Sequence, residues 1–380
     1  MTKEPKNLWN SNLILSDIPW DYYLHPCPTL YAQELSKNGP TLWVNPPTRN
    51  PIKTRLIFKN KNLIILTPII FKRSSIDSGF SRFEVRLQIK IIVSIFLGLT
   101  SSVWSISTAY PHLLTENPNA KSIFWSGDFF SPIEEFSKYK NFDLILCLTP
   151  LKYAMVPNTF KGGKLDFHMC TDSTVKTSRN HPVEIMELVT IRNKACSFTK
   201  IAGYVGTLSS RRFDFEIFLH AVTVLKNVLF VVIGKSDGTQ KTERLIKKLL
   251  TYKNILFIDG MPYENIHSAI DCFDICLIPY RVDFANLGTC PTKFIDYCAS
   301  GKTVLSTNLP GLQKFGDLCL FANDKDDFCR LINSFDPSKN SLAKDRIQLS
   351  KNSSPDHFLE KFQNSFNRTH KSCKVGIPIT

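Results

Sequence analysis

The segment from residue 291 to 296 brings together residue types that bind phosphate and hydroxyl groups. Pro291 and Thr292 stand where a helix is expected to begin, and proline is tolerated in a first turn because its missing N–H would have no partner there. The free amides of such a helix start attract anions, and Lys293 adds a full positive charge. Asp296 follows one turn later and could accept hydrogen bonds from hydroxyls. The alternative is a plain surface ion pair between Lys293 and Asp296.

A second candidate anion site follows a strand expected at residues 200–206. Gly206 and Thr207 would bring backbone amides close to a ligand, the helix expected next would add its positive end, and Arg211 or Arg212 could contact phosphate oxygens. Taken alone, this pattern fits equally well a glycine in a tight turn followed by two solvated arginines. The sequence contains no G-x-G-x-x-G or P-loop pattern, which disfavours a dinucleotide-dependent dehydrogenase and an NTPase.

Short apolar strands alternate with amphipathic helices along most of the chain, which indicates parallel sheets covered by helices. In the first half, strands are expected at residues 12–18, 41–47, 62–68, 102–108, 121–127 and 143–150, with a helix at 29–39. In the second half, strands are expected at 200–206, 228–234, 254–260, 275–280 and 302–307, and helices at 212–225, 242–250, 263–271 and 291–300. The predicted fold class is α/β, with two Rossmann-like domains facing across a cleft.

The length of 380 residues exceeds what one hydrophobic core usually serves. We predict four parts of the chain: a first Rossmann-like domain at 1–175, a linker at 176–198, a second Rossmann-like domain at 199–345, and a terminal helix and tail at 346–380. Open α/β sheets bind ligands at the carboxyl ends of their strands. Both candidate anion sites, and Tyr280 at the end of the strand 275–280, should therefore lie at the cleft.

The composition indicates what kind of partner the protein binds and in which cellular compartment it is found. The formal net charge of +14 at pH 7 favours an anionic partner. The eleven cysteines are scattered, which is typical of reduced thiols in a core. The first twelve residues lack the apolar segment of a secretory signal, and residues 91–110 divide into a helix-like and a strand-like part, which disfavours a membrane span. We expect a cytoplasmic protein.

Several of these segments together resemble a known family. Residues 203–214, 233–234, 254–262, 274–281 and 291–307 are similar, in order and spacing, to the C-terminal half of GT-B glycosyltransferases of families 1 and 4, above all to a bacterial group that makes polysaccharides and teichuronic acid. Residues 18–21, 42–47 and 124–130 resemble the N-terminal half of that group more loosely. The resemblance implies transfer of a sugar from a nucleotide-diphosphate donor to a glycan or lipid-linked acceptor in cell-surface polysaccharide synthesis.

The resemblance also implies roles for individual residues. Gly206 and the following amides, with Arg212, would lie beside the diphosphate, and the 291–293 segment would present amides and a cation to the same group. Asp296 takes the place of a glutamate that holds the ribose hydroxyls, and the turn Gly260, Met261 and Pro262 would meet the base through its backbone. The sequence departs from the family pattern at Asp296, Ser300, Thr303 and His25.

Sugar transfer requires stabilisation of the departing diphosphate and a base for the acceptor hydroxyl. As the base we consider Asp21, His25 and Asp128, all in loops after strands of the first domain, and we prefer Asp21; each could instead be a cap or turn residue. The only D-x-D sequence, Asp324 to Asp326, is expected to be a solvated loop and not a metal site. We expect a metal-independent hexosyltransferase without a cofactor, using a UDP-sugar as its favoured donor.

Residues 49–90 contain ten lysines or arginines against two acidic residues, with Phe58, Phe71 and Phe80 interleaved. Such a cationic and aromatic face could rest on anionic lipid, as a peripheral protein at the inner face of the membrane would. A solvated basic surface is the alternative. Because the stretch matches no nucleic-acid-binding motif, a nucleic-acid partner is not expected. A nucleotide-sugar epimerase, a phosphorylase and a non-catalytic nucleotide or nucleic-acid binder remain rival functions.

Overall fold

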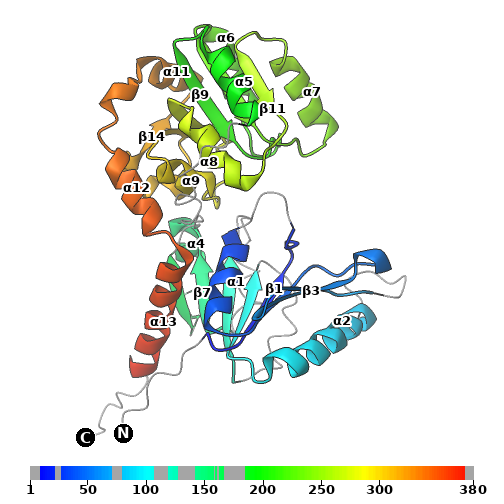
Figure 1. Cartoon of the computed structure of the whole chain (residues 1–380). Helices are drawn as coiled ribbons and strands as arrows, with labels where there is room; N and C mark the ends of the chain where they lie inside the picture. Colours follow the sequence, from blue (N-terminus) through cyan, green and yellow to red (C-terminus); the bar gives the residue numbers. More distant parts are fainter. Residues whose placement is uncertain are drawn as a thin grey trace, which may run out of the picture.

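The structure is a computed structural model, which describes residues 9–21, 27–70, 79–106, 119–126, 142–157, 159–160, 162–166 and 185–372. Within these residues the chain forms two separate sheets with helices packed around them (Figure 1). The predicted α/β class with two Rossmann-like domains is confirmed.

The first sheet has eight strands in the order β3-β4-β2-β1-β5-β6-β7-β8, and only β3 and β4 pair antiparallel. Its strands are β1 Asn12–Ser16, β2 Thr41–Val44, β3 Arg55–Asn60, β4 Leu63–Thr67, β5 Ser102–Ile106, β6 Lys121–Ser126, β7 Leu144–Cys147 and β8 Gly163–Asp166. The helical elements of this domain are α1 Cys27–Asn38, η1 Pro51–Lys53, α2 Gly79–Ile92, the π-helical η2 Val93–Leu97 and α4 Pro150–Met155.

Both faces of the first sheet are buried, as in most parallel sheets. Leu13 and Leu15 of β1 pack in one apolar cluster with Val85 of α2. Ile14, on the opposite face, packs in another cluster with Tyr31 of α1. The near-continuous apolar runs that marked these strands in the sequence follow from this double burial.

The second sheet has six strands, all parallel, in the order β11-β10-β9-β12-β13-β14. Its strands are β9 Lys200–Val205, β10 Val228–Ile233, β11 Ile255–Ile258, β12 Ile275–Ile278, β13 Thr303–Thr307 and β14 Cys319–Ala322. The helical elements are α5 Met186–Ala195, α6 Phe215–Val224, α7 Gln240–Leu249, α8 Tyr263–Asp271, α9 Lys293–Ala299, α10 Pro310–Gln313, η5 Gly316–Leu318, α11 Lys325–Ser334, η6 Pro337–Lys339 and α12 Ala343–Lys351.

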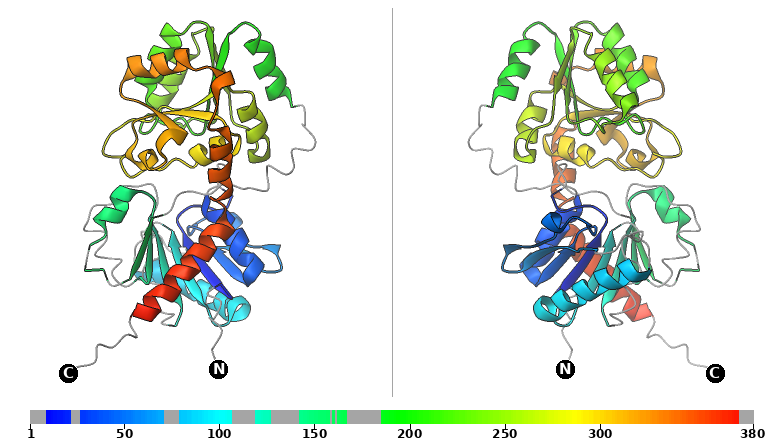
Figure 2. Two further views of the ribbon diagram at one scale, coloured as in Figure 1. Left: turned by 90° about the vertical axis from the view of Figure 1, so that its left-hand side faces the viewer. Right: turned by 90° about the vertical axis from the view of Figure 1, so that its right-hand side faces the viewer.

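The end of the chain returns to the first domain. α12 packs against α9 of the second domain, and the next helix, α13 Pro355–Ser372, packs against α1 and β8 of the first (Figure 2). There the ring of Phe362 stacks on Tyr31 with centroids 6.2 Å apart, and it lies equally far from Trp104. The last helix therefore completes the core of the domain in which the chain began.

The two domains touch where their strands end. α4 follows β7 and α10 follows β13, and these two helices contact each other. Lys314 Nζ, just after α10, donates a hydrogen bond of 3.2 Å to the Leu148 carbonyl. The carboxyl ends of both sheets thus point toward the junction of the domains (Figure 1).

Some elements differ from the prediction or were missed. α5 occupies part of the predicted linker, yet its Leu188 and Ile191 are buried in the cluster that includes the second domain. The exact domain boundaries stay predictions, since residues 167–184 lie outside the described part. Three strands, β3, β8 and β14, and five helices, α4, α5, α10, α11 and α12, were not predicted, and only the end of α2 was expected to be helical. β3 is largely exposed and lacks an apolar alternation, which explains why it was missed.

Two expectations on composition can be compared with the described residues. Seven of their nine free cysteines are buried. Within the described residues no helix is long and apolar enough to cross a membrane. The segment that was considered as a membrane span is divided between η2 and β5.

Candidate active site

The strand order of the second sheet reverses between β9 and β12, which is the place where open α/β sheets bind ligands. These strands pair only at Ile275 with Ala202 and at Cys276 with Gly203, and they separate toward their carboxyl ends. Tyr297 of α9 fills the gap: its hydroxyl accepts a hydrogen bond of 2.8 Å from the Val205 amide. A side chain from α9 therefore fixes the end of β9 at the candidate site.

The loops that follow β9 and β12 are joined to each other. The Arg281 amide donates to the Arg212 carbonyl at 2.7 Å, and the Asp214 amide donates to the Pro279 carbonyl at 2.7 Å. Phe213 and Tyr280 form an isolated antiparallel bridge between them. The two loops, far apart in sequence, thus bring Arg212 and Tyr280 to one place.

Lys293 reaches into this place from the first residue of α9. Its Nζ donates a hydrogen bond of 3.0 Å to the Tyr280 hydroxyl and lies 3.9 Å from the centroid of the Tyr204 ring. A Cβ on Gly206 would lie 2.4 Å from this Nζ, and Gly206 has a φ of 137°, which side chains rarely adopt. Only glycine at 206 leaves room for the ammonium group.

Burial and neighbouring charges shift the pKa values of Lys293 and Tyr280. Burial lowers the pKa of Lys293 below its usual value, and the charge of Arg212 lowers it further, against the opposing effect of Tyr280. Burial acts to raise the pKa of Tyr280, but the positive charges of Lys293 and Arg212 and the Lys293 hydrogen bond outweigh it, so that the pKa is lowered. Two cations held together in a partly buried place favour an anionic ligand.

The surroundings of Gly206 differ from the sequence prediction in two respects. Its own amide donates to the Ile233 carbonyl at 2.8 Å and so is already used. No helix begins beside it, because α6 starts only at Phe215 and its first amides bond to the carboxylate of the cap residue Asp214. The helix expected to begin at residue 212 thus begins at Phe215, and the expectation that its free amides add positive charge beside Gly206 is wrong. The adjacent Thr207 carbonyl accepts a hydrogen bond of 2.8 Å from Tyr204, which shapes the turn.

The start of α9 also lies slightly later than predicted. Thr292 occupies the cap position and Lys293 is the first helical residue, so Pro291 precedes the helix and is not in its first turn. The Pro291 carbonyl accepts a hydrogen bond of 3.0 Å from the Phe294 amide. The correction is small, and Lys293 stays at the helix start beside Tyr280.

Asp296 is buried and faces α8, not Lys293. Its Oδ1 accepts a hydrogen bond of 2.9 Å from the Tyr263 hydroxyl and lies 4.0 Å from His267 Nε2. Lys293 and Asp296 thus bond to different residues. They do not form the surface ion pair that was considered as an alternative from the sequence. Because Asp296 is 8% exposed, a ribose hydroxyl would have to approach its carboxylate beside Tyr263.

The turn expected to meet the base leads directly into this arrangement. Gly260 has a φ of 74°, Met261 is partly buried, and Pro262 is the cap residue of α8. Tyr263, the next residue, is the one that bonds to Asp296. The turn expected to meet the base is therefore linked through the Tyr263 hydroxyl to Asp296, the residue expected to bind the ribose.

Arg211 and Arg212 differ in position. Arg211 is exposed, and its carbonyl accepts a hydrogen bond of 3.1 Å from the buried Asn286 side chain. Arg212 is partly buried and acts on the pKa of both Lys293 and Tyr280. Arg212 is thus the arginine that belongs to the cationic cluster with Lys293.

In the first domain, Asp21 lies in the loop after β1. Asn45 fixes this loop, since its Oδ1 accepts hydrogen bonds of 2.8 Å from the Trp20 amide and from Trp43 Nε1. The Asp21 side chain is 67% exposed and its Oδ2 lies 3.9 Å from Arg55 Nη1. The other two candidate bases, His25 and Asp128, lie outside the described residues.

The D-x-D sequence opens a helix instead of forming a loop. The Asp324 carboxylate accepts hydrogen bonds from the Asp326 and Asp327 amides at 3.0 and 2.8 Å, as the N-cap of α11. Asp326 lies 2.9 Å from His220 Nε2. Nowhere in the described part of the chain do three or more His, Cys, Asp or Glu residues gather as a metal site would require.

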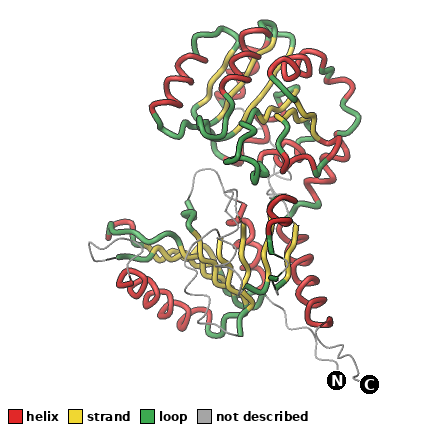
Figure 3. Tube along the Cα trace, turned by 180° about the vertical axis from the view of Figure 1, so that it is seen from behind, coloured by secondary structure: helices red, strands yellow, loops and turns green. Residues whose placement is uncertain are grey.

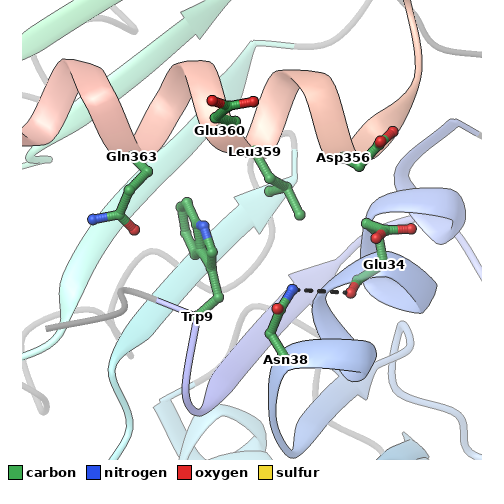
Figure 4. A pocket seen from close by; sticks show the side chains of 7 residues that line it. All are labelled: Trp9, Glu34, Asn38, Asp356, Leu359, Glu360 and Gln363. Carbon is green, nitrogen blue, oxygen red and sulfur yellow. Dashed lines mark hydrogen bonds between the residues drawn. The ribbon is translucent and has the colours of Figure 1, made fainter.

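A cavity of about 410 Å³ lies away from this site, between α1 and α13 (Figure 4). It is lined by Trp9, Glu34, Asn38, Asp356, Leu359, Glu360 and Gln363. Trp9 and Asn38 precede β1 and β2, so the cavity is at the amino ends of the strands, opposite to the candidate site.

Sequence reasoning missed the tyrosines of the site. Tyr204, Tyr297 and Tyr263 bond to the Thr207 carbonyl, the Val205 amide and Asp296 respectively. The first two stand within the motif segments, but a tyrosine inside an apolar run is most simply interpreted as core. Tyr297 and Tyr263 act through contacts with segments far away in the chain, and a single sequence does not show which segments meet.

Comparison with known proteins gives a family for the second domain. Residues 199–335 match the family model of the glycosyl transferases group 1. The second domain is a group 1 glycosyltransferase domain. Its matched range contains every donor-binding candidate, from Gly206 to Asp296, and so confirms the family resemblance over this half. The glycosyltransferase TuaH of Bacillus subtilis, named for teichuronic acid biosynthesis, is 25% identical over 114 residues, which are 30% of this chain and 28% of that protein's length.

Solved structures resemble the whole fold at low sequence identity. Trehalose-6-phosphate synthase of E. coli, bound with UDP-2-fluoro glucose, has a TM-score of 0.69 and 10% identity, covering 94% of this chain and 99% of its own. Sucrose-phosphate synthase of Thermosynechococcus elongatus has a TM-score of 0.68 and 12% identity, covering 96% and 99%. These similarities show a GT-B fold for the glycosyltransferase domain and the domain that precedes it.

Proposed function

We propose that the protein transfers a sugar from a nucleotide-diphosphate donor to a hydroxyl group of a glycan or lipid-linked acceptor. The observation that carries this proposal is the pair of cations Lys293, which lies against Gly206, and Arg212, whose charge acts on Lys293, at the place where the strand order of the glycosyltransferase domain's sheet reverses. Two cations at that place fit a diphosphate better than a neutral ligand or a single carboxylate.

The nucleoside part of the donor would lie toward α8. The turn from Gly260 to Pro262 offers backbone groups to the base, and Asp296 offers its carboxylate to the ribose beside Tyr263. A UDP-sugar is the favoured donor, and the trehalose-6-phosphate synthase of E. coli, which has the same fold, binds a ligand of this kind, UDP-2-fluoro glucose.

The reaction breaks the bond between the anomeric carbon and the diphosphate oxygen and forms a bond from that carbon to the acceptor oxygen. The negative charge that develops on the diphosphate is stabilised by Lys293 and Arg212, without a metal ion. The acceptor hydroxyl loses a proton, and Asp21 is the described carboxylate proposed to take it. Asn45 would position Asp21 by holding its loop.

The acceptor and the setting are proposed from the relative's function. The name of the Bacillus subtilis relative points to cell-surface polysaccharide synthesis, and a hexose is the proposed sugar. Synthesis of that kind on a lipid-linked acceptor would place the protein in the cytoplasm, at the inner face of the membrane.

A donor screen tests the proposal. The purified protein is incubated with UDP-hexoses, GDP-mannose and related donors, with and without EDTA, and release of the nucleoside diphosphate is measured. We expect release from one donor class, insensitive to EDTA. Lys293→Ala and Arg212→Ala should raise the donor concentration needed, whereas Asp21→Asn should lower the turnover with little change in donor affinity. No release from any donor, together with no binding of any nucleoside diphosphate, would refute the proposal.

A further inference from the structure

Large apolar side chains are exposed mainly along one edge of the first domain. Fourteen large hydrophobic residues are exposed in the described part of the chain, and eight of them lie between residues 52 and 99: Ile52, Leu56, Phe58, Phe83, Leu87, Ile91, Ile95 and Leu99. Soluble proteins rarely gather exposed apolar side chains in this way unless the surface contacts something. The same edge carries most of the basic segment noted in the sequence.

α2 and the π-helical η2 that continues it supply most of these residues. Val85 and Ile89 face inward and are buried against the first sheet. On another side of the helix, exposed apolar residues recur at every fourth position: Phe83 at 59%, Leu87 at 48%, Ile91 at 50% and Ile95 at 66%. A helix that only covered a sheet would carry polar residues there. The spacing therefore makes a second, outward apolar stripe.

Cations run beside this stripe. Arg82, Arg86 and Lys90 each stand one position before an apolar residue of the stripe, and all three are exposed. The only acidic residue of α2, Glu84, is half-buried. A helix with an apolar stripe bordered by a basic one has the composition of helices that lie at the surface of a membrane.

The edge strand β3 extends the surface. Its Phe58 is 56% exposed and contacts Phe96 of η2, with ring centroids 5.3 Å apart. Arg55 and Lys59 of the same strand are exposed as well. We call residues 52–59 together with 82–99 the amphipathic edge. Figure 3 shows α2 and β3 projecting sideways from the first domain, where a flat partner could reach them.

We propose that the amphipathic edge docks the protein on an anionic lipid bilayer. The apolar stripe enters the boundary between headgroups and acyl chains, and the lysines and arginines contact acidic headgroups. A second copy of this chain would bring two rows of like charge together, and a nucleic acid has no use for the apolar stripe. The docking does not depend on the proposed sugar transfer, although it would bring the protein to a lipid-linked acceptor.

Sedimentation with vesicles tests the docking. The full-length protein is mixed with vesicles of phosphatidylcholine alone or with added phosphatidylglycerol, at low and high salt, and the bound fraction is measured. We expect binding only to the anionic vesicles, weakened by salt. The triple variant R82Q/R86Q/K90Q should bind about a hundredfold less tightly at low salt, at about 1 kcal/mol for each charge. The variant F83S/L87S/I91S should lose binding as well.

Matched variants on the glycosyltransferase domain serve as controls. K241Q/K247Q/K248Q on α7 removes the same charge from exposed positions, and V224S/L250S/V282S removes exposed apolar residues elsewhere. Both should bind vesicles as the wild type does. Equal loss in the α7 variant, equal binding to neutral vesicles, or a wild-type dimer that the F83S/L87S/I91S variant converts to monomer would each overturn the proposal. Donor release measured on the same proteins without lipid separates this outcome from a failure of the proposed function.

Discussion

At the scale of single residues, the site depends on a glycine and a lysine that are 87 positions apart in the chain. Lys293 fits beneath the backbone of Gly206 because no Cβ stands there, and its ammonium lies between the rings of Tyr204 and Tyr280. Aromatic faces and a hydroxyl keep the charge in place while leaving it able to bind an anion. The lowered pKa of Lys293 shows that this placement opposes the charged form.

Substitution of Gly206 by alanine should displace Lys293. The added Cβ would lie 2.4 Å from Nζ, so the ammonium must move. Loss of a charge-assisted hydrogen bond is worth about 1.5–3 kcal/mol, and we expect UDP affinity to fall by about tenfold to a hundredfold in calorimetric titration. Gly238→Ala is the matched control, because φ is 73° there but nothing lies within 4 Å of an added Cβ. Similar losses in both variants would assign the effect to backbone strain.

The pKa of Lys293 predicts how UDP binding responds to pH. Burial and Arg212 lower this pKa in the free protein, and a bound diphosphate would raise it by favouring the charged form. Affinity should therefore fall as the pH rises through the lowered pKa of the free protein, below the range of an ordinary lysine. Lys293→Arg keeps its charge over this range and should lose the alkaline decline, whereas ionisation of UDP itself affects both proteins equally. Parallel pH profiles for the two proteins would exclude Lys293 as the titrating group.

At the scale of elements, α9 supplies both the cation and the support of the site. Lys293 extends to the loops, and Tyr297, one turn later, bonds to β9 where it separates from β12. Thr307 of β13 also donates to the Tyr280 carbonyl at 2.6 Å, which fixes the end of β12. The short helix thus places its lysine where the ends of three strands meet.

Removal of the Tyr297 hydroxyl should destabilise the glycosyltransferase domain. In Tyr297→Phe the Val205 amide loses its acceptor, and an unsatisfied amide in the interior costs about 1–3 kcal/mol. Urea unfolding followed by circular dichroism measures the change. Tyr252→Phe is the control, since within the described residues the Tyr252 hydroxyl makes no hydrogen bond. An unchanged unfolding midpoint in Tyr297→Phe would show that another group satisfies Val205.

The sequence was sufficient for most elements but not for their mutual contacts. β10 is a continuous apolar run, Val228–Ile233, buried on both faces, and its type was predictable from that alone. β3 was missed because Arg55–Asn60 is an exposed edge strand with mixed polarity. The bond from Tyr263 to Asp296 joins residues 33 positions apart on different helices. Neither periodicity nor composition predicts such a pairing, whereas the residue types at the candidate donor site were recognisable from their motif.

At the scale of the whole molecule, the chain ends by closing the domain in which it began. α13 places Phe362 against Tyr31 and Trp104 after the chain has completed the glycosyltransferase domain. The first domain's core is therefore incomplete until the last helix is in place. Its folding depends on contacts between residues more than 250 positions apart, which are slow to form.

Phe362→Ala should destabilise the first domain selectively. Removal of a fully buried phenylalanine costs about 3–5 kcal/mol. All five tryptophans lie between residues 9 and 125, so their fluorescence reports unfolding of this domain. We expect a lower midpoint by fluorescence in Phe362→Ala. Phe328→Ala, at a buried position of α11, should instead lower the midpoint seen by circular dichroism and leave the tryptophan signal unchanged, and the reverse pattern would contradict this view of α13.

The central claim is that Lys293, held beneath Gly206, binds the diphosphate of a nucleotide donor. Calorimetric titration of UDP into the wild type, Lys293→Met and Lys247→Met tests it most directly, because Lys247→Met removes the same charge from an exposed position of α7. We expect Lys293→Met to bind UDP at least about tenfold more weakly than the wild type, and Lys247→Met to bind it unchanged. Equal affinity of the wild type and Lys293→Met would contradict the claim.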